Sequence, residues 1–162
     1  MNHISIRYAN HDDAKFLKKW LMDPEILKWF PMTDEREIDD AVKHWISYSK
    51  IGSALTLLHN ENPVGNAILY ICPFKKLAHQ ALFAIILDKN FRKKGLGKIL
   101  LESIILLGKK KFHLELLHLE VYEKNPAVFL YEKLGFVKFG CEKRFVKENN
   151  HYKAKIMMQK HL

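Results

Sequence analysis

The stretch IILDKNFRKKGLGKILLE (residues 85–102) joins an apolar segment to an apolar helical pattern through a short cationic loop. Three cationic residues and two glycines stand where the helix should begin: Arg92, Lys93, Lys94, Gly95 and Gly97. The first N–H groups of a helix lack internal partners and carry partial positive charge, and glycine lets a bulky ligand approach the backbone. The stretch therefore predicts a phosphate or pyrophosphate site at a helix N-terminus.

The common nucleotide-binding loops do not fit this stretch. A P-loop needs Lys followed by Ser or Thr, but Lys98 is followed by Ile99. A dinucleotide fingerprint needs a third glycine where this chain has Leu100. A basic helix start on a solvated face is the alternative interpretation.

The rest of the chain predicts an α/β fold with a central strand–loop–helix–strand unit. Strands are predicted at residues 4–9, 54–59, 64–71, 80–87, 114–122, 136–140 and 154–159. Helices are predicted at residues 11–21, 34–48 and 95–110, and in a short segment capped by Asn125 and ended by Gly135. Segment 80–87 is a continuous apolar run, which is typical of a strand buried on both faces. Segment 23–31 is predicted as a break between helices.

Composition limits the class of protein. The chain has 162 residues, is 48% hydrophobic and carries a formal charge of +9, so we expect one domain over residues 1–162 with anionic partners. It contains no apolar run near the roughly 20 residues that span a membrane, and we expect no membrane partner.

Cys72 and Cys141 lack metal or redox spacing, so we expect free thiols in a cytoplasmic protein. His113, Glu115 and His118 lack the spacing of a helical zinc motif and fall in a predicted strand, so we expect no metal. We expect a monomer or homodimer.

Two motifs in order resemble the GNAT superfamily of N-acetyltransferases. Arg92, Gly95 and Gly97 match the pattern Arg/Gln-x-x-Gly-x-Gly/Ala that follows a buried strand in that superfamily. The segment LEVYEKNPAVFLYEKLGF (residues 119–136) resembles its second motif, which ends in Leu-Tyr-Glu-x-x-Gly-Phe. The resemblance implies a mixed, mostly antiparallel central sheet, splayed at a cofactor wedge and covered by helices on both faces.

The resemblance also implies acetyl-CoA as co-substrate and direct transfer of its acetyl group to an amine. It places the pyrophosphate on the loop and helix start, and the pantetheine arm along the end of the buried strand. The implied cofactor-binding residues are Ile85, Ile86, Leu87, Arg92, Lys93, Lys94, Gly95, Leu96, Gly97, Lys98, Asn125 and Tyr131. The spacing from Asn125 to Tyr131 is one residue shorter than is usual in the family, and Pro126 could absorb the difference by tightening the first helical turn.

Two residues are candidates for the catalytic proton transfers. Tyr131 fills the family's tyrosine position and is the implied general acid, with a half-buried helical tyrosine as the alternative. Glu120 resembles the base position of ribosomal-protein alanine N-acetyltransferases. Desolvation among Leu117, Leu119 and Val121 would suit Glu120 to act as a base. An exposed carboxylate facing Lys or Arg is the alternative, and bound water could instead be the base.

The predicted function is acetyl-CoA-dependent N-acetyltransfer to a primary amine of a peptide N-terminus or a small molecule. Trp29, Phe30 and Tyr152 could line the acceptor pocket or belong to the core. Two other functions stay open: a catalytically inert acyl-CoA-binding regulator, and a basic nucleic-acid-binding module. The second would use lysines 93, 94, 98 and 109–111, but no nucleic-acid-binding motif is present, and we expect no such partner.

Overall fold

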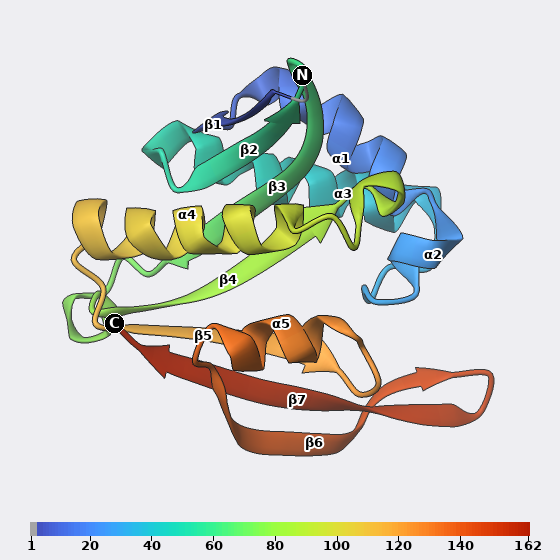
Figure 1. Cartoon of the computed structure of the whole chain (residues 1–162). Helices are drawn as coiled ribbons and strands as arrows, with labels where there is room; N and C mark the ends of the chain where they lie inside the picture. The colour runs from blue at the N-terminus through green and yellow to red at the C-terminus, as the bar shows by residue number, and fades with distance from the viewer. Residues whose placement is uncertain (1–2) are drawn as a thin grey trace.

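A computed structural model describes residues 3–162, and its centre is one seven-stranded sheet (Figure 1). The strand order is β1-β2-β3-β4-β5-β7-β6, and all neighbours are antiparallel except β4 and β5, which are parallel. The strands are β1 (Ile4–Tyr8), β2 (Ala54–His59), β3 (Asn62–Ile71), β4 (Gln80–Leu87), β5 (Leu116–Tyr122), β6 (Val137–Glu148) and β7 (His151–His161). The helices are α1 (Ala14–Leu21), α2 (Pro24–Leu27), α3 (Glu35–Ser47), α4 (Leu96–Lys111) and α5 (Ala127–Lys133).

Helices cover both faces of the sheet and separate two hydrophobic cores. In Figure 1, α4 and α5 lie in front of the sheet, and α1 and α3 lie behind it. The core on the α4 and α5 side includes Leu100, Leu117 and Phe136, and the core on the α1 and α3 side includes Trp20 and Ile68. The predicted fold class, an α/β chain with helices on both faces of a mostly antiparallel sheet, is confirmed.

The sheet opens in its middle, between its two parallel strands. β4 and β5 pair only through Gln80–Leu116, Ala81–Leu117 and Leu82–His118. Beyond these pairs β4 is bonded to β3 alone and β5 to β7 alone, and the two strands diverge (Figure 1). The predicted splay of the sheet is therefore present, and it leaves two strand edges without partners along the gap.

The gap also modifies the prediction for β4. Its side chains alternate between the two cores, as expected for a strand with neighbours on both faces. Ala84 and Ile85 nevertheless stay partly exposed, because they lie where β5 has moved away.

The capping and turn residues of the last helix act as the sequence predicts. The Asn125 side-chain oxygen accepts a hydrogen bond from the Ala127 N–H at 3.0 Å, and the regular helix begins at Ala127. Gly135 follows the helix with a φ of 89°, a conformation that favours glycine.

Two segments differ from their predicted form. The predicted break at residues 23–31 contains the short helix α2, which Asp23 caps through a hydrogen bond from the Glu25 N–H at 3.0 Å. The last two strands are much longer than the predicted 136–140 and 154–159. The pairing of β5 with β7 ends at Tyr122–Lys155, and residues 143–154 extend beyond β5 as a two-stranded arm (Figure 1). The arm is mostly polar, so its strands have no hydrophobic period to reveal them.

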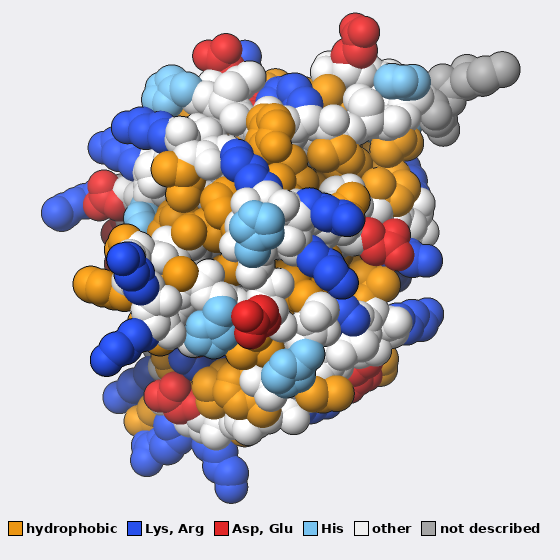
Figure 2. Space-filling model, turned by 90° about the vertical axis from the view of Figure 1, so that its left-hand side faces the viewer, with side chains coloured by type: hydrophobic (Ala, Val, Ile, Leu, Met, Phe, Trp, Pro, Cys, Tyr) orange, Lys and Arg blue, Asp and Glu red, His pale blue; other side chains and the backbone are white. Residues whose placement is uncertain are grey.

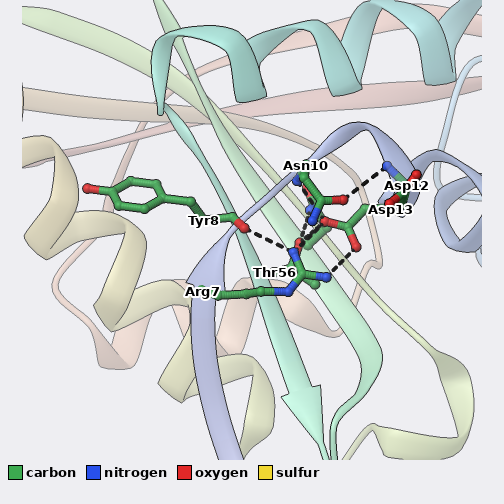
Figure 3. Close-up of polar contacts among 7 residues, drawn as sticks. Arg7, Tyr8, Asn10, Asp12, Asp13 and Thr56 are labelled. Atoms are coloured by element: carbon green, nitrogen blue, oxygen red, sulfur yellow. Dashed lines mark hydrogen bonds and ion pairs between the residues drawn. The ribbon is translucent and has the colours of Figure 1, made fainter.

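A polar network ties the first strand to the first helix (Figure 3). The Arg7 guanidinium donates two hydrogen bonds to the Asp13 carboxylate, at 2.7 and 2.8 Å. Thr56 on β2 donates a third, at 2.7 Å, and the Asn10 N–H donates a fourth, at 3.0 Å. Burial alone would raise the pKa of Asp13, which is 2% exposed, but these hydrogen bonds hold it below its ordinary value.

The network continues under the sheet to α3. Asn66 on β3 donates to the Thr56 hydroxyl at 2.9 Å, and the Trp45 indole donates to the Asn66 side-chain oxygen at 2.6 Å. Each of these polar groups is buried and has a partner, so the network fixes α3 and the segment before α1 against β2 and β3.

We expect Asp13→Asn to lower the free energy of unfolding by about 2–3 kcal/mol at pH 7, because it removes the charge opposite Arg7. The pKa of Asp13 is lowered by folding, so its contribution is present above about pH 4 and is lost as the pH falls further. Urea unfolding at pH 7 and pH 3 measures this, with the exposed Asp12→Asn as control. Equal stability of the two variants at pH 7 would contradict the assignment.

Candidate functional site

A cavity of about 530 Å³ lies along the gap between β4 and β5, which is within the range of small-molecule sites. Its walls come from β4 and β5, the loop before α4, the first turn of α4, the start of α5, and the segment after α2. Eleven of the thirteen predicted cofactor-binding and catalytic residues line it: Ile85, Ile86, Leu87, Arg92, Lys93, Gly95, Gly97, Lys98, Glu120, Asn125 and Tyr131. The structure thus brings together residues from two motifs that are far apart along the chain.

Two of the residues predicted to bind the cofactor do not line the cavity. The Lys94 ammonium lies 5.0 Å from the ring centroid of Phe91, on the loop itself. Leu96 is 5% exposed and belongs to the core under α4. Lys93 and Gly95 have left-handed backbone conformations (φ 57° and 77°), which turn the chain before Lys94 and before Leu96. The side chains of Lys94 and Leu96 therefore point away from the cavity.

The start of α4 has the features of an anion site. The first helical hydrogen bond is donated by the Ile99 N–H to the Gly95 carbonyl at 3.3 Å, so the N–H groups of the three preceding residues have no partner within the helix. Arg92, Lys93 and Lys98 stand on the same wall. A Cβ built on Gly95 would meet no atom within 4 Å, and one built on Gly97 would contact Leu130 at 3.4 Å, so the backbone at Gly95 borders open space.

Positive charge is not confined to the start of α4, so charge alone does not identify this site. Figure 2 shows Lys and Arg side chains spread over the end of the molecule at which α4 ends, with hydrophobic side chains exposed between them. The start of α4 differs from these other cationic surfaces in its glycines and in the N–H groups that have no partner within the helix.

Tyr131 lies under the gap, on the α5 side of the sheet. Its ring packs against Phe83 and Phe136, with centroids 6.0 and 6.2 Å away. The residue is 7% exposed, and burial raises the pKa of its hydroxyl to about 12. A hydroxyl with this pKa stays protonated over the physiological range and can donate a proton.

The same pKa predicts how stability depends on alkaline pH. Between pH 10 and 12 the unfolded tyrosine ionises and the folded one does not, so the folded state loses stability as the pH rises. At pH 11 the loss from this one group is roughly 1 kcal/mol. Tyr131→Phe lacks this hydroxyl. In urea unfolding, we expect its loss of stability between pH 8 and pH 11 to be smaller than that of wild type by this amount. The exposed Tyr8→Phe is the control, and equal losses in Tyr131→Phe and wild type would contradict the prediction.

Glu120 reaches the cavity from the opposite face of the sheet. The apolar neighbours expected to desolvate it, Leu117, Leu119 and Val121, point to the core on the α4 and α5 side because successive strand residues alternate. The Glu120 side chain is 43% exposed, and its carboxylate lies 3.3 Å from the Lys155 ammonium. The structure therefore matches the alternative interpretation, an exposed carboxylate facing a lysine, although the residue does line the cavity.

The segment after α2 closes one side of the cavity. Trp29 and Phe30 line it, and Phe30 packs on Trp45 with ring centroids 6.3 Å apart. Tyr152 does not: it lies on the arm, where the Arg144 guanidinium is 4.0 Å from its ring centroid. Phe83 and Leu119 are lining residues that sequence reasoning missed, although their place on the strands beside the gap could have indicated them.

Within residues 3–162, no cluster of three or more His, Cys, Asp or Glu side chains is placed to hold a metal ion. Among the same residues, no helix has the length and apolar character needed to cross a membrane.

Comparison with known proteins identifies the family. The model of the acetyltransferase (GNAT) family matches residues 15–136. The chain belongs to this family. It is similar to the [ribosomal protein bS18]-alanine N-acetyltransferase of Haemophilus influenzae, with 36% identity over 91 residues, or 56% of this chain. That match spans 59% of the curated relative's length, less than two thirds.

Solved structures share the fold over nearly the whole chain. The ribosomal-protein-alanine N-acetyltransferase of Brucella melitensis has a TM-score of 0.79 at 20% identity, covering 98% of this chain and 99% of the other. The yncA structure of Salmonella typhimurium, solved with its cofactor acetyl-CoA, has a TM-score of 0.81 at 18% identity, covering 98% and 94%. At these identities the likeness shows the fold alone.

Proposed function

We propose that this GNAT-family chain transfers the acetyl group of acetyl-CoA directly to a primary amine. The observation that carries the proposal is one cavity that contains the anion site at α4, the unpaired strand edges and the Tyr131 side chain. The order of these features along the gap suits a long ligand with phosphates at one end and a reactive group at the other.

The residues present fit such a ligand. The N–H groups of the α4 start, with Arg92, Lys93 and Lys98, would hold the pyrophosphate. The unpaired edge of β4 beyond Leu82 would hydrogen-bond the amides of the pantetheine arm. Asn125 can serve the same arm only in part, because its side-chain oxygen already accepts from Ala127.

The proposed chemistry divides the proton transfers between two side chains. Acetyl-CoA supplies an acetyl thioester, and transfer joins the acetyl carbon to the amine nitrogen and breaks the carbon–sulfur bond. Tyr131 would donate its proton to the leaving sulfur. Glu120, directly or through water, would accept the proton that the amine loses. Phe83 and Phe136 hold the tyrosine ring beneath the gap.

A peptide N-terminus is the acceptor we favour, since the curated relative is named for alanine acetylation of a ribosomal protein. A small-molecule amine is the second candidate, because aromatic walls such as Trp29 and Phe30 suit either. We place the activity in the cytoplasm, in keeping with two free cysteines, and leave the oligomeric state as monomer or homodimer.

Titration calorimetry with acetyl-CoA at two salt concentrations, with desulfo-CoA as control, tests the cofactor. We expect one-to-one binding of both ligands, since neither the phosphate contacts nor the pantetheine contacts need the sulfur. If neither ligand binds, and an oligonucleotide binds with an affinity that falls steeply as the salt concentration rises, the nucleic-acid alternative replaces this proposal.

Two cations of the same loop provide a matched test of the anion site. We expect Arg92→Ala to weaken acetyl-CoA binding about tenfold, because it removes a charged hydrogen-bond donor from the cavity wall. Lys94→Ala removes the same charge from a side chain that stacks on Phe91, and should stay within about twofold of wild type. Equal losses in both variants would indicate general electrostatic attraction and no defined phosphate site.

Removal of the Tyr131 hydroxyl tests the acid. We expect Tyr131→Phe to lower kcat at least a hundredfold with a peptide that begins with alanine, while the Kd of acetyl-CoA changes less than about threefold. Steady-state kinetics and calorimetry on the same sample separate the two effects. A variant as active as wild type would show that another group protonates the sulfur. An inert regulator would bind acetyl-CoA, and its wild type would transfer nothing.

A further inference from the structure

Lys155 is a buried lysine that the proposed reaction does not use. It lies on β7, is 8% exposed, and its ammonium stands 3.8 Å from the ring centroid of Phe145. Taking a charged amine out of water costs several kcal/mol unless partners compensate for the lost hydration. A methionine of similar length would fill the same space without that cost, so stability alone gives little reason for a lysine here.

The partners of Lys155 are two carboxylates on the strands beside it. Glu142 on β6 is its direct cross-strand neighbour, and Glu120 on β5 is the diagonal one. Its Nζ lies 3.3 Å from Glu120 and 3.4 Å from Glu142. Only Glu120 lines the cavity.

We infer that Lys155 is a positioning residue. It holds the Glu120 carboxylate at the cavity wall, where that carboxylate would contact the acceptor amine or the water that carries its proton. The inference rests on the proposed function and extends it to a residue outside the cavity. Lys155 is itself held in place by burial, by Phe145 and by Glu142, so its position is fixed independently of the acceptor. Glu120, by contrast, is 43% exposed, and without this contact its three side-chain torsions would be free to sample other conformations.

The other polar groups around Glu120 cannot substitute for the lysine. His118 and Tyr122 share its strand face, and Tyr70 comes from β3, near enough for the Glu120 charge to affect all three. None of these groups forms a hydrogen bond or ion pair with Glu120 among the described residues, and the buried Tyr122 hydroxyl has no partner there at all. Lys155 is the cation that the structure pairs with this carboxylate.

A double-mutant cycle tests the inference with the full chain, acetyl-CoA and a peptide that begins with alanine. We expect Lys155→Met to lower kcat/KM about tenfold in wild type but less than twofold in a Glu120→Gln background, since the lysine acts only through that carboxylate. Lys155→Arg keeps the charge and should recover most of the activity. The Kd of acetyl-CoA should stay unchanged throughout.

Two controls separate positioning from general structure. Lys153→Met removes the next lysine of the same strand, which pairs with Glu148 at 3.4 Å on the arm, and should stay within twofold of wild type. Glu142→Gln removes the second partner of Lys155 and should also stay within about twofold, since Glu120 and Phe145 remain.

The inference is overturned if the losses from Lys155→Met and Glu120→Gln multiply in the double variant, or if Lys155→Arg is as impaired as Lys155→Met. If the wild-type protein transfers acetyl groups neither to the alanine peptide nor to butylamine, a simple primary amine, the proposed function itself is wrong. In that case, the midpoints of urea unfolding of the same four proteins still test the pairing of Lys155 with Glu120. Additive shifts in the midpoint would overturn that pairing.

Discussion

A strand edge inside a protein must find partners for its backbone N–H and C=O groups, and the divergence of β4 from β5 creates two such edges. The aromatic contacts among Phe83, Tyr131 and Phe136 fill the space below the gap on the α5 side and keep the strands from closing onto each other. Every other feature of the site depends on this opening. It lets α4 begin beside a cavity, and it lets side chains from both sheet faces reach the same space.

Access from both faces lets one cavity hold the two side chains that we propose for the proton transfers. Tyr131 approaches from the apolar α5 side, where burial keeps its hydroxyl protonated. Glu120 approaches from the other face, where it is more exposed and lies beside a lysine. A closed sheet would place its own backbone between the two groups. The different electrostatic surroundings of these two cavity-lining groups therefore follow from the topology of the sheet.

Local patterns sufficed for much of this architecture. Apolar runs predicted β2 and β4 to the residue, and capping chemistry predicted the short helix after Asn125. Contacts between distant segments were beyond such patterns. The pairing of Lys155 with Glu120 joins residues far apart in sequence, and the arm has no hydrophobic period because both its sides meet water. The sequence left the surroundings of Glu120 open between a desolvated and an exposed carboxylate, and the structure matches the exposed one because sequence neighbours on a strand point to the opposite face.

The outer edges of the sheet have a consequence for how the molecule behaves in concentrated solution. At one side, β1 is only five residues long. At the other, β6 carries Lys138, Lys143 and Lys147, and its register with β7 shifts twice. Short, charged and irregular edges are poor templates for strands of other molecules, and they limit aggregation. The unpaired edges inside the gap, residues 83–87 of β4 and 119–122 of β5, are also short, and they lie along the cavity rather than at the outside of the sheet.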